Sequence, residues 1–239
     1  MQITSFPSNE RGHVQFDWLN TYHSFSFGQY YDPKKIHYGA LRVLNDDAID
    51  GGMGFGTHPH DNMEIITIPL FGDLHHRDST GRDCIIKEND VQIMSAGSGI
   101  QHSEVNPNRD KKVELFQIWI FPKERNITPR YDQKSFLPKD REDQLLTVVS
   151  PNDPNTLFIN QDAWLSLGHF IKPFSSEYAF HQAGQGLYAM CIEGSCTIEG
   201  QVLGKRDAVG ISGVDKVSIE AAAGSDLLLI EIPYFVAGA

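Results

Sequence analysis

Cysteine, basic residues and long apolar runs are scarce in this sequence. Three of its 239 residues are cysteines, Cys84, Cys191 and Cys196, and no two of them have the CxxC spacing of a zinc site. An odd number of cysteines without that spacing favours buried free thiols over a disulfide framework. No apolar run reaches the roughly 18 residues of a membrane helix, and the first residues lack the basic and apolar segments of a secretory signal. We therefore expect a cytoplasmic protein that does not act in a membrane.

The charge balance is acidic. Lysine and arginine together number 20, against 31 for aspartate and glutamate, so the formal net charge is −11. The longest basic clusters are Lys34-Lys35 and Lys111-Lys112, whereas the neutralisation of phosphates needs a basic stripe. We therefore expect no direct nucleic-acid binding, and we expect the chain to be a monomer.

Short β-rich runs recur along the chain, with turn signals between them. Examples are residues 39–45, 63–70 and 113–121, which are bounded by turns such as Gly51-Gly52. Long stretches with a period of 3.6 residues do not occur, so the pattern favours a sandwich or barrel over a helical domain. The sequence predicts an all-β protein.

A polar and charged stretch, Leu137–Gln144, interrupts the strand pattern and is typical of a linker. A second set of strand-like runs follows it, including residues 187–192 and 227–232. Two β domains of similar size are therefore expected. The predicted division is an N-terminal domain over 1–136, a linker over 137–148 and a C-terminal domain over 149–239.

Two short segments carry the strongest chemical signal. His58 and His60 are two residues apart, so on a strand they point to the same face, with Cα atoms roughly 6.6 Å apart. His102 and Glu104 repeat this arrangement after a Gly-rich turn that can adopt positive φ values. Three imidazoles and a carboxylate suit one divalent transition metal with open coordination positions. We predict that the three histidines and at least one carboxylate bind the ion, with iron expected and zinc, nickel, cobalt, manganese or copper as alternatives.

The histidines of the predicted C-terminal domain have no such pairing. His169 and His181 lie 12 residues apart, so the C-terminal domain is predicted to hold no metal. Phe55, Met94 and Trp119 could line the site or belong to the core, and their type favours the core. Structural or surface roles are expected for six of the other histidines, namely His23, His37, His75, His76, His169 and His181.

The histidine segments resemble the two cupin motifs. Gly52 to Glu64 is similar to the first motif, although its closing glycine, Gly72, falls one residue late. Gly99, His102 and Asn106 are similar to the second motif. The variant HPH followed by GxxHSE resembles the pirin family, as do the upstream segments 18–19, 23–27, 30–33 and 41–46. The resemblance is dense over Asp17–Pro129 and is strongest to the bacterial members tested as quercetin 2,3-dioxygenases.

The pirin resemblance implies a bicupin of two antiparallel jelly-roll barrels, with the metal in the first. In most cupins the fourth ligand is the glutamate of the first motif, here Glu64, which keeps the parity of His60 and would face the same interior on a regular strand. In pirins it is the glutamate after the second-motif histidine, here Glu104. The resemblance therefore assigns Glu104 to the metal and leaves Glu64 behind the histidines as a hydrogen-bond partner.

The implied activity is oxidative. The bacterial relatives imply a dioxygenase that binds a small aromatic flavonol such as quercetin, reacts it with dioxygen and opens its central ring with loss of carbon monoxide. Glu104 is the candidate catalytic base. The alternative, implied by the eukaryotic pirins, is a non-enzymatic metal- or redox-sensing regulator that binds other proteins.

Overall fold

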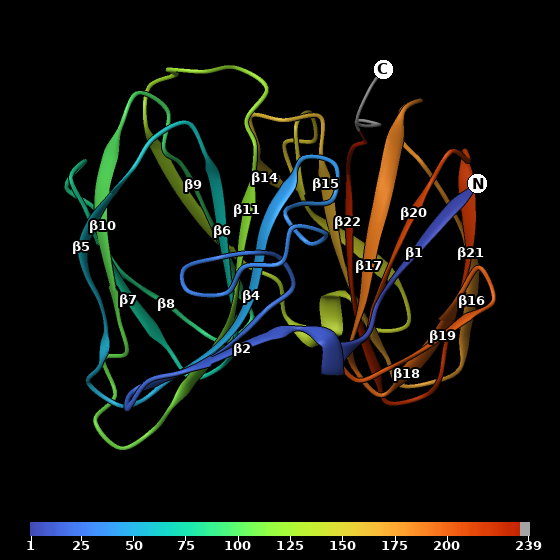
Figure 1. Ribbon diagram of the computed structural model, residues 1–239, viewed down its shortest axis with the longest axis horizontal. Coiled ribbons are helices and arrows are strands. Elements are labelled where there is room, and N and C mark those ends of the chain that lie inside the picture. Colours follow the sequence, from blue (N-terminus) through green and yellow to red (C-terminus); the bar gives the residue numbers. More distant parts are fainter. Residues whose placement is uncertain (235–239) are drawn as a thin grey trace.

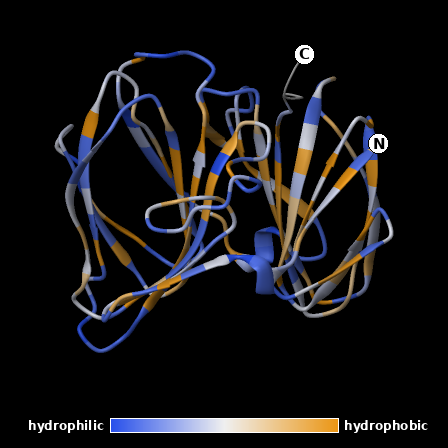
Figure 2. Cartoon of the chain, in the orientation of Figure 1, coloured by the Kyte–Doolittle hydropathy of each residue, from blue (hydrophilic) through white to orange (hydrophobic). Residues whose placement is uncertain are grey.

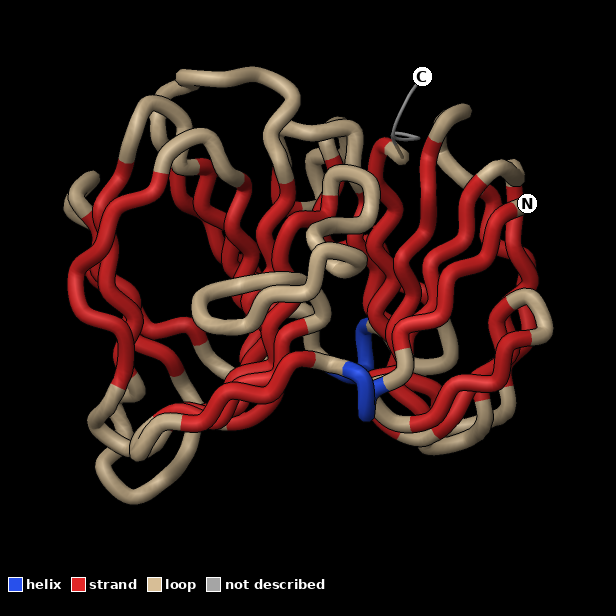
Figure 3. Tube along the Cα trace, in the orientation of Figure 1, coloured by secondary structure: helices blue, strands red, loops and turns tan. Residues whose placement is uncertain are grey.

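Strands form almost all of the regular structure in the computed structural model, which describes residues 1–234 (Figure 3). The helical elements of this part of the chain are two single turns, η1 (Ser8–Glu10) and η2 (Pro138–Asp140). No helix within residues 1–234 is long and apolar enough to cross a membrane. The prediction of an all-β fold is confirmed.

The N-terminal half is a barrel of two antiparallel sheets, a large one at the centre of the molecule and a small one at its outer side (Figure 1). The large sheet has the order β12 (Arg130–Ser135), β9 (Asp90–Ser95), β6 (Glu64–Phe71), β11 (Val113–Ile120), β4 (Leu41–Ile49), β3 (Leu19–His23) and β2 (Gly12–Gln15). The small sheet has the order β5 (Gly54–His60), β10 (Ile100–Val105), β7 (Leu74–Asp78) and β8 (Asp83–Ile86).

The C-terminal half repeats this arrangement of seven and four strands. Its large sheet has the order β1 (Gln2–Phe6), β20 (Ala208–Ser212), β17 (Gln185–Glu193), β22 (Ser225–Pro233), β15 (Trp164–Phe170), β13 (Leu145–Ser150) and β14 (Leu157–Phe158). Its small sheet has the order β16 (Phe174–Ala179), β21 (Lys216–Ala221), β18 (Ser195–Ile198) and β19 (Gln201–Gly204). The predicted pair of cupin-type barrels is therefore present.

The two large sheets pack face to face and share one apolar core, which appears as bands of hydrophobic residues on the central strands (Figure 2). Alternation along each strand decides which side chains reach this core. In β6, Ile66 and Ile68 belong to the core between the barrels, where they join residues such as Leu228 and Ile230 of β22. Thr67 has the opposite parity and lies inside the first barrel, where its hydroxyl contacts Glu104.

The strand map bears on the predicted division of the chain. β1 pairs with β20, so residues 2–6 lie in the large sheet of the C-terminal half. β13 begins at Leu145, within the segment predicted as a linker. The division at 137–148 stays a prediction, and we propose that residues 2–6 belong to the second domain.

Candidate metal centre

The pairing of β5 with β10 places the predicted ligands on the inner face of the small sheet. His102 lies opposite His58, and Ile100 lies opposite His60. The register then shifts: between the pairs His102–His58 and Glu104–Phe55, β10 has one residue and β5 has two. This bulge turns Phe55 to the same face as His58, although three positions separate them.

Glycines allow this close pairing. A Cβ atom on Gly54 would lie 2.2 Å from the carbonyl oxygen of Glu104, so no larger residue fits there without a shift of the strand. Gly97 and Gly99, in the turn before β10, have φ values of 49° and 132°. These values confirm the expectation that the Gly-rich turn uses the left-handed region.

Three imidazoles converge between these strands. The ring centroids are 4.8 Å apart for His58 and His60, 4.4 Å for His58 and His102, and 4.9 Å for His60 and His102. One nitrogen of each ring lies within 4.8 Å of the others. The structure therefore brings together three side chains that come from two distant segments of the sequence.

The protonation of the rings suits metal binding. His58 Nδ1 lies 2.8 Å from the carbonyl oxygen of Gly56 and donates to it, which leaves Nε2 with a free lone pair. Burial, together with the neighbouring imidazoles, lowers the pKa of His60 to about 4 and that of His102 to about 3. Both rings are therefore neutral near pH 7.

His102 gives the clearest sign that a ligand belongs here. Its side chain is buried, and neither ring nitrogen has a hydrogen-bond partner among residues 1–234. A buried polar atom without a partner costs about 1–3 kcal/mol, and a metal ion would remove that cost for one nitrogen. The donor set therefore fits a divalent transition metal.

Glu104 lies beside His102 but further from the other two histidines. Its buried carboxylate accepts hydrogen bonds from Thr67 Oγ1 at 3.2 Å and from Gln117 Nε2 at 2.9 Å. Its ligand atom lies within 4.8 Å of those of His102 and His76. It does not lie within 4.8 Å of the ligand atoms of all three residues His58, His60 and His102. The assignment of Glu104 as the fourth ligand stays a proposal.

His76 lies beside the predicted ligands, a position that the expected structural or surface role did not specify. It lies opposite Glu104 on β7, is fully buried, and its ring centroid is 5.3 Å from that of His102. Asp78 pairs with it at 2.9 Å. The sequence held a signal that was missed, since His76 and Asp78 have the same two-residue spacing as the predicted ligand pairs.

Glu64 faces away from the metal centre, so the expectation that it supports the histidines is wrong. Its carboxylate accepts hydrogen bonds from Ser95 Oγ at 2.8 Å and from the backbone N–H of Asn160 at 3.2 Å. The parity argument failed because the bend around Asn62, with φ of 47°, carries the chain from the small sheet to the large one. On β6, Glu64 shares the face of Ile66, which packs against the second barrel.

A small cavity of about 60 Å³ adjoins the predicted ligands. Phe55 and Trp119 line it, as the sequence allowed, whereas Met94 belongs to an apolar cluster with Ile65 and Ile100. Lining residues that the sequence analysis missed are Phe27, Asn45, Asp47 and Gln117. The signal for them in the sequence was weak, because single residues of these types occur in many places in a protein and do not by themselves indicate a site.

Asp47 is a second buried carboxyl at this cavity. Burial raises the pKa of its side chain to about 7, with a smaller contribution from Glu104. The cavity therefore combines neutral imidazoles with an acid that can hold a proton near neutral pH.

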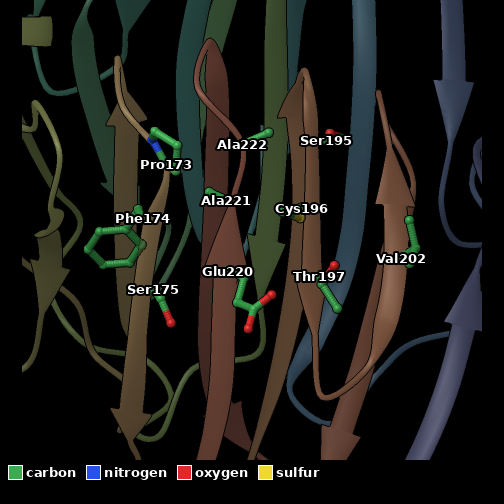
Figure 4. A pocket seen from close by; sticks show the side chains of 10 residues that line it. All are labelled: Pro173, Phe174, Ser175, Ser195, Cys196, Thr197, Val202, Glu220, Ala221 and Ala222. Atoms are coloured by element: carbon green, nitrogen blue, oxygen red, sulfur yellow. The ribbon is translucent and has the colours of Figure 1, made fainter.

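The C-terminal half presents a different kind of depression. A surface pocket of about 440 Å³ spreads across β16, β21, β18 and β19 (Figure 4). Of the described residues that line it, Glu220 is the one with a charge, and no histidine is among them. His169 and His181, elsewhere in this half, pair with Asp226 at 2.8 Å and with Glu231 at 2.7 Å. Each thus contacts a carboxylate rather than a second imidazole.

Two β-barrels of this kind, with a histidine cluster inside the first, define a bicupin. Comparison with known proteins gives the family. The profile of the family described as Pirin matches residues 7–120, and that of the Quercetinase C-terminal cupin domain matches residues 147–232. This chain belongs to the pirin family, which confirms the resemblance found in the sequence.

Similar proteins align over nearly the whole chain. A quercetin 2,3-dioxygenase of Escherichia coli is 41% identical over 229 residues, which are 95% of this chain and 96% of that protein. A pirin-like protein of Caulobacter vibrioides is 37% identical over 94% of this chain and 97% of its own length. The bacterial pirin YhhW of E. coli in complex with nickel(II) is 39% identical, with a TM-score of 0.92 over 98% of this chain and 100% of that one.

Proposed function

We propose that this protein is a metal-dependent dioxygenase that opens the central ring of flavonols such as quercetin and releases carbon monoxide. The observation that carries the proposal is the cluster of His58, His60 and His102 beside Glu104. It occurs in a chain that is 41% identical to a quercetin 2,3-dioxygenase. Three nitrogen donors and one carboxylate leave positions on a metal ion for oxygen atoms of substrates.

The metal would be one divalent ion per chain, held by His58, His60, His102 and Glu104. Sets of histidines and a carboxylate with open positions are typical of non-haem Fe(II) oxygenases, so iron is the ion we propose. The same donors accept zinc, nickel, cobalt, manganese and copper, and the nickel(II) complex of YhhW is consistent with this range. Elemental analysis of protein purified without added metal identifies the ion.

The side chains around the ion would have distinct roles. When bound, the metal would lower the pKa of a flavonol hydroxyl that coordinates it. Glu104 would take the proton from that hydroxyl, because Thr67 and Gln117 orient its carboxylate beside His102. The indole N–H of Trp119 is buried and has no hydrogen-bond partner among residues 1–234, so it can donate to an oxygen of the substrate.

A flavonol needs more space than the cavity offers. Pockets for ligands of this size have volumes of about 300–1,000 Å³, whereas this cavity has about 60 Å³. Phe27, between β3 and β4, packs edge-on against Trp119 with ring centroids 5.2 Å apart. We propose that the flat substrate replaces Phe27 against this indole.

Oxygen-dependent turnover of quercetin tests the proposed activity. The double variant His58→Ala/His60→Ala should lose both the metal and the turnover, and His181→Ala, in the other barrel, should lose neither. Glu104→Gln should weaken metal binding and suppress turnover. Full metal occupancy in the double variant would show that the ligands are wrongly assigned.

The small cavity also favours a second candidate function, a regulator that senses metal or redox state and binds other proteins. Such a protein needs a metal ion but no space for a flavonol. Metal-loaded protein that does not turn over quercetin, but binds a cellular protein differently in the two oxidation states of its metal, would support the regulator against the enzyme.

The cytoplasmic location, the monomeric state and the lack of direct nucleic-acid binding stay predictions from the sequence. Light scattering on the purified chain tests the second of these.

A further inference from the structure

A buried pair, His76 and Asp78, lies behind the metal centre. Both side chains are fully buried, and His76 Nε2 is 2.9 Å from Asp78 Oδ2. The other oxygen of Asp78 accepts hydrogen bonds from the backbone N–H groups of Thr80, at 2.8 Å, and Arg82, at 3.3 Å, and from the Thr80 hydroxyl. An ionised carboxylate has only acceptors, and Asp78 already accepts three hydrogen bonds at this one oxygen.

This arrangement decides which nitrogen of His76 carries the hydrogen. Since Asp78 accepts, Nε2 is the donor, and Nδ1 is left as the nitrogen that can accept a hydrogen bond. Nδ1 is buried and has no partner within residues 1–234. An acceptor in that position needs a donor or a metal ion, because desolvation without a partner costs about 1–3 kcal/mol.

His102 lies beside His76, and neither of its two ring nitrogens has a hydrogen-bond partner among the described residues. The rings of His76 and His102 are 5.3 Å apart between centroids, and they have ligand atoms within 4.8 Å of each other. One nitrogen of His102 can bind an ion, and the other then carries a hydrogen that needs an acceptor.

We propose that His76 is a positioning residue of the metal centre. Asp78 fixes the hydrogen of His76 on Nε2. With an ion at the centre, His76 Nδ1 would accept the N–H of His102, a hydrogen bond that the two rings do not make in this structure, and the remaining nitrogen of His102 would face the ion. The inference rests on the proposed metal site and goes beyond it by assigning a carboxylate–histidine–histidine chain behind one ligand.

The strand order argues against His76 as a direct ligand of the same ion. β10 lies between β5 and β7 in the small sheet, so His58 and His60 approach His102 from one side and His76 approaches it from the other. The ligand atoms of His58, His60 and His102 lie within 4.8 Å of one another, and that of His76 does not lie within this distance of all three. The ring of Tyr131 packs on His76 with centroids 4.7 Å apart and holds it on that side.

The neighbouring residue offers a matched control. His75 lies on the opposite face of β7, where its Nε2 contacts Asp83 at 2.6 Å and its side chain is 28% exposed. A His75 variant therefore removes a histidine of the same strand that also pairs with an aspartate, without touching the centre.

The test is nickel(II) affinity, measured by competition with a chelator, and the visible absorption of the cobalt(II)-loaded protein. Asp78→Asn is nearly isosteric, and its amide can donate to His76 Nε2, which would place the hydrogen on Nδ1 and remove the acceptor. Asp78→Asn and His76→Phe should each weaken nickel binding roughly 10–100-fold and shift the cobalt bands. His75→Phe should change neither the affinity nor the spectrum. His76→Asn can place its amide oxygen where Nδ1 of His76 lies, so it should bind nickel more tightly than His76→Phe.

Two results would overturn the inference alone. One is wild-type affinity and spectrum in Asp78→Asn, provided that the metal-free variant melts as a folded protein. The other is the loss of one imidazole from the metal in His76→Phe, counted by X-ray absorption, because His76 would then be a ligand. Wild-type protein that binds no nickel would overturn the proposed function together with the inference.

Discussion

Replacing Glu64 with glutamine should change how the stability of this protein depends on pH. Glu64 is completely buried against the second barrel, where Ser95 and Asn160 donate to one of its oxygens. Its other oxygen has no hydrogen-bond partner in the described part of the chain. Burial, only partly offset by these hydrogen bonds, raises the pKa of Glu64 from its ordinary value of 4.5 to about 7.

The magnitude follows from linkage. The folded protein holds this proton more tightly than the unfolded chain does, so the folded state is favoured at low pH. Its free energy of unfolding should fall as the pH rises from about 4.5 to about 7 and then level off. A pKa difference of about 2.5, at about 1.36 kcal/mol for each pKa unit, corresponds to about 3 kcal/mol.

The assay is chemical denaturation of metal-free wild-type protein and Glu64→Gln between pH 5 and pH 8. Glutamine cannot titrate, so the stability of the variant relative to the wild type should rise by most of that 3 kcal/mol across this range. Glu88→Gln, at an exposed position, controls for the loss of a negative charge. Parallel pH profiles for wild type and Glu64→Gln would refute the reasoning.

Three further perturbations test the centre. Gly54→Ala should destabilise the protein by about 1–3 kcal/mol, seen as a lower melting temperature, because its Cβ would meet β10 at 2.2 Å. At Gly56 an added Cβ atom would have no other atom within 4 Å, so Gly56→Ala should cost much less. Equal melting temperatures for the two variants would contradict the close approach of β10 to Gly54. Thr67→Val removes a donor to Glu104 and should weaken nickel binding by about tenfold in a chelator titration, whereas unchanged affinity would mean that this hydrogen bond does not orient the ligand. Phe27→Ala should lower the KM for quercetin, since the ring occupies the space that the substrate needs, and an unchanged KM would place the substrate elsewhere.

Much of the fold and part of the centre could be predicted from local patterns in the sequence. Short strands with turn signals predicted the all-β architecture, because the alternation of apolar residues reports which face of a strand is buried. His58 with His60, and His102 with Glu104, could be recognised for the same reason. Residues two apart on a strand share a face wherever that strand lies.

Only the tertiary structure decided which faces meet. The pairing of β7 with β10 put His76 behind His102, and nothing in the segment around His76 specifies that partner strand. The crossing from the small sheet to the large one turned Glu64 toward the second barrel and ended the parity it shared with His60. The volume of the cavity depends on Phe27, which a loop brings against Trp119 from a distant part of the chain. Alternation is a local property of the backbone, whereas strand pairing and cavity size arise from contacts between residues far apart in sequence, and these contacts determine how the metal centre is supported and how much space adjoins it.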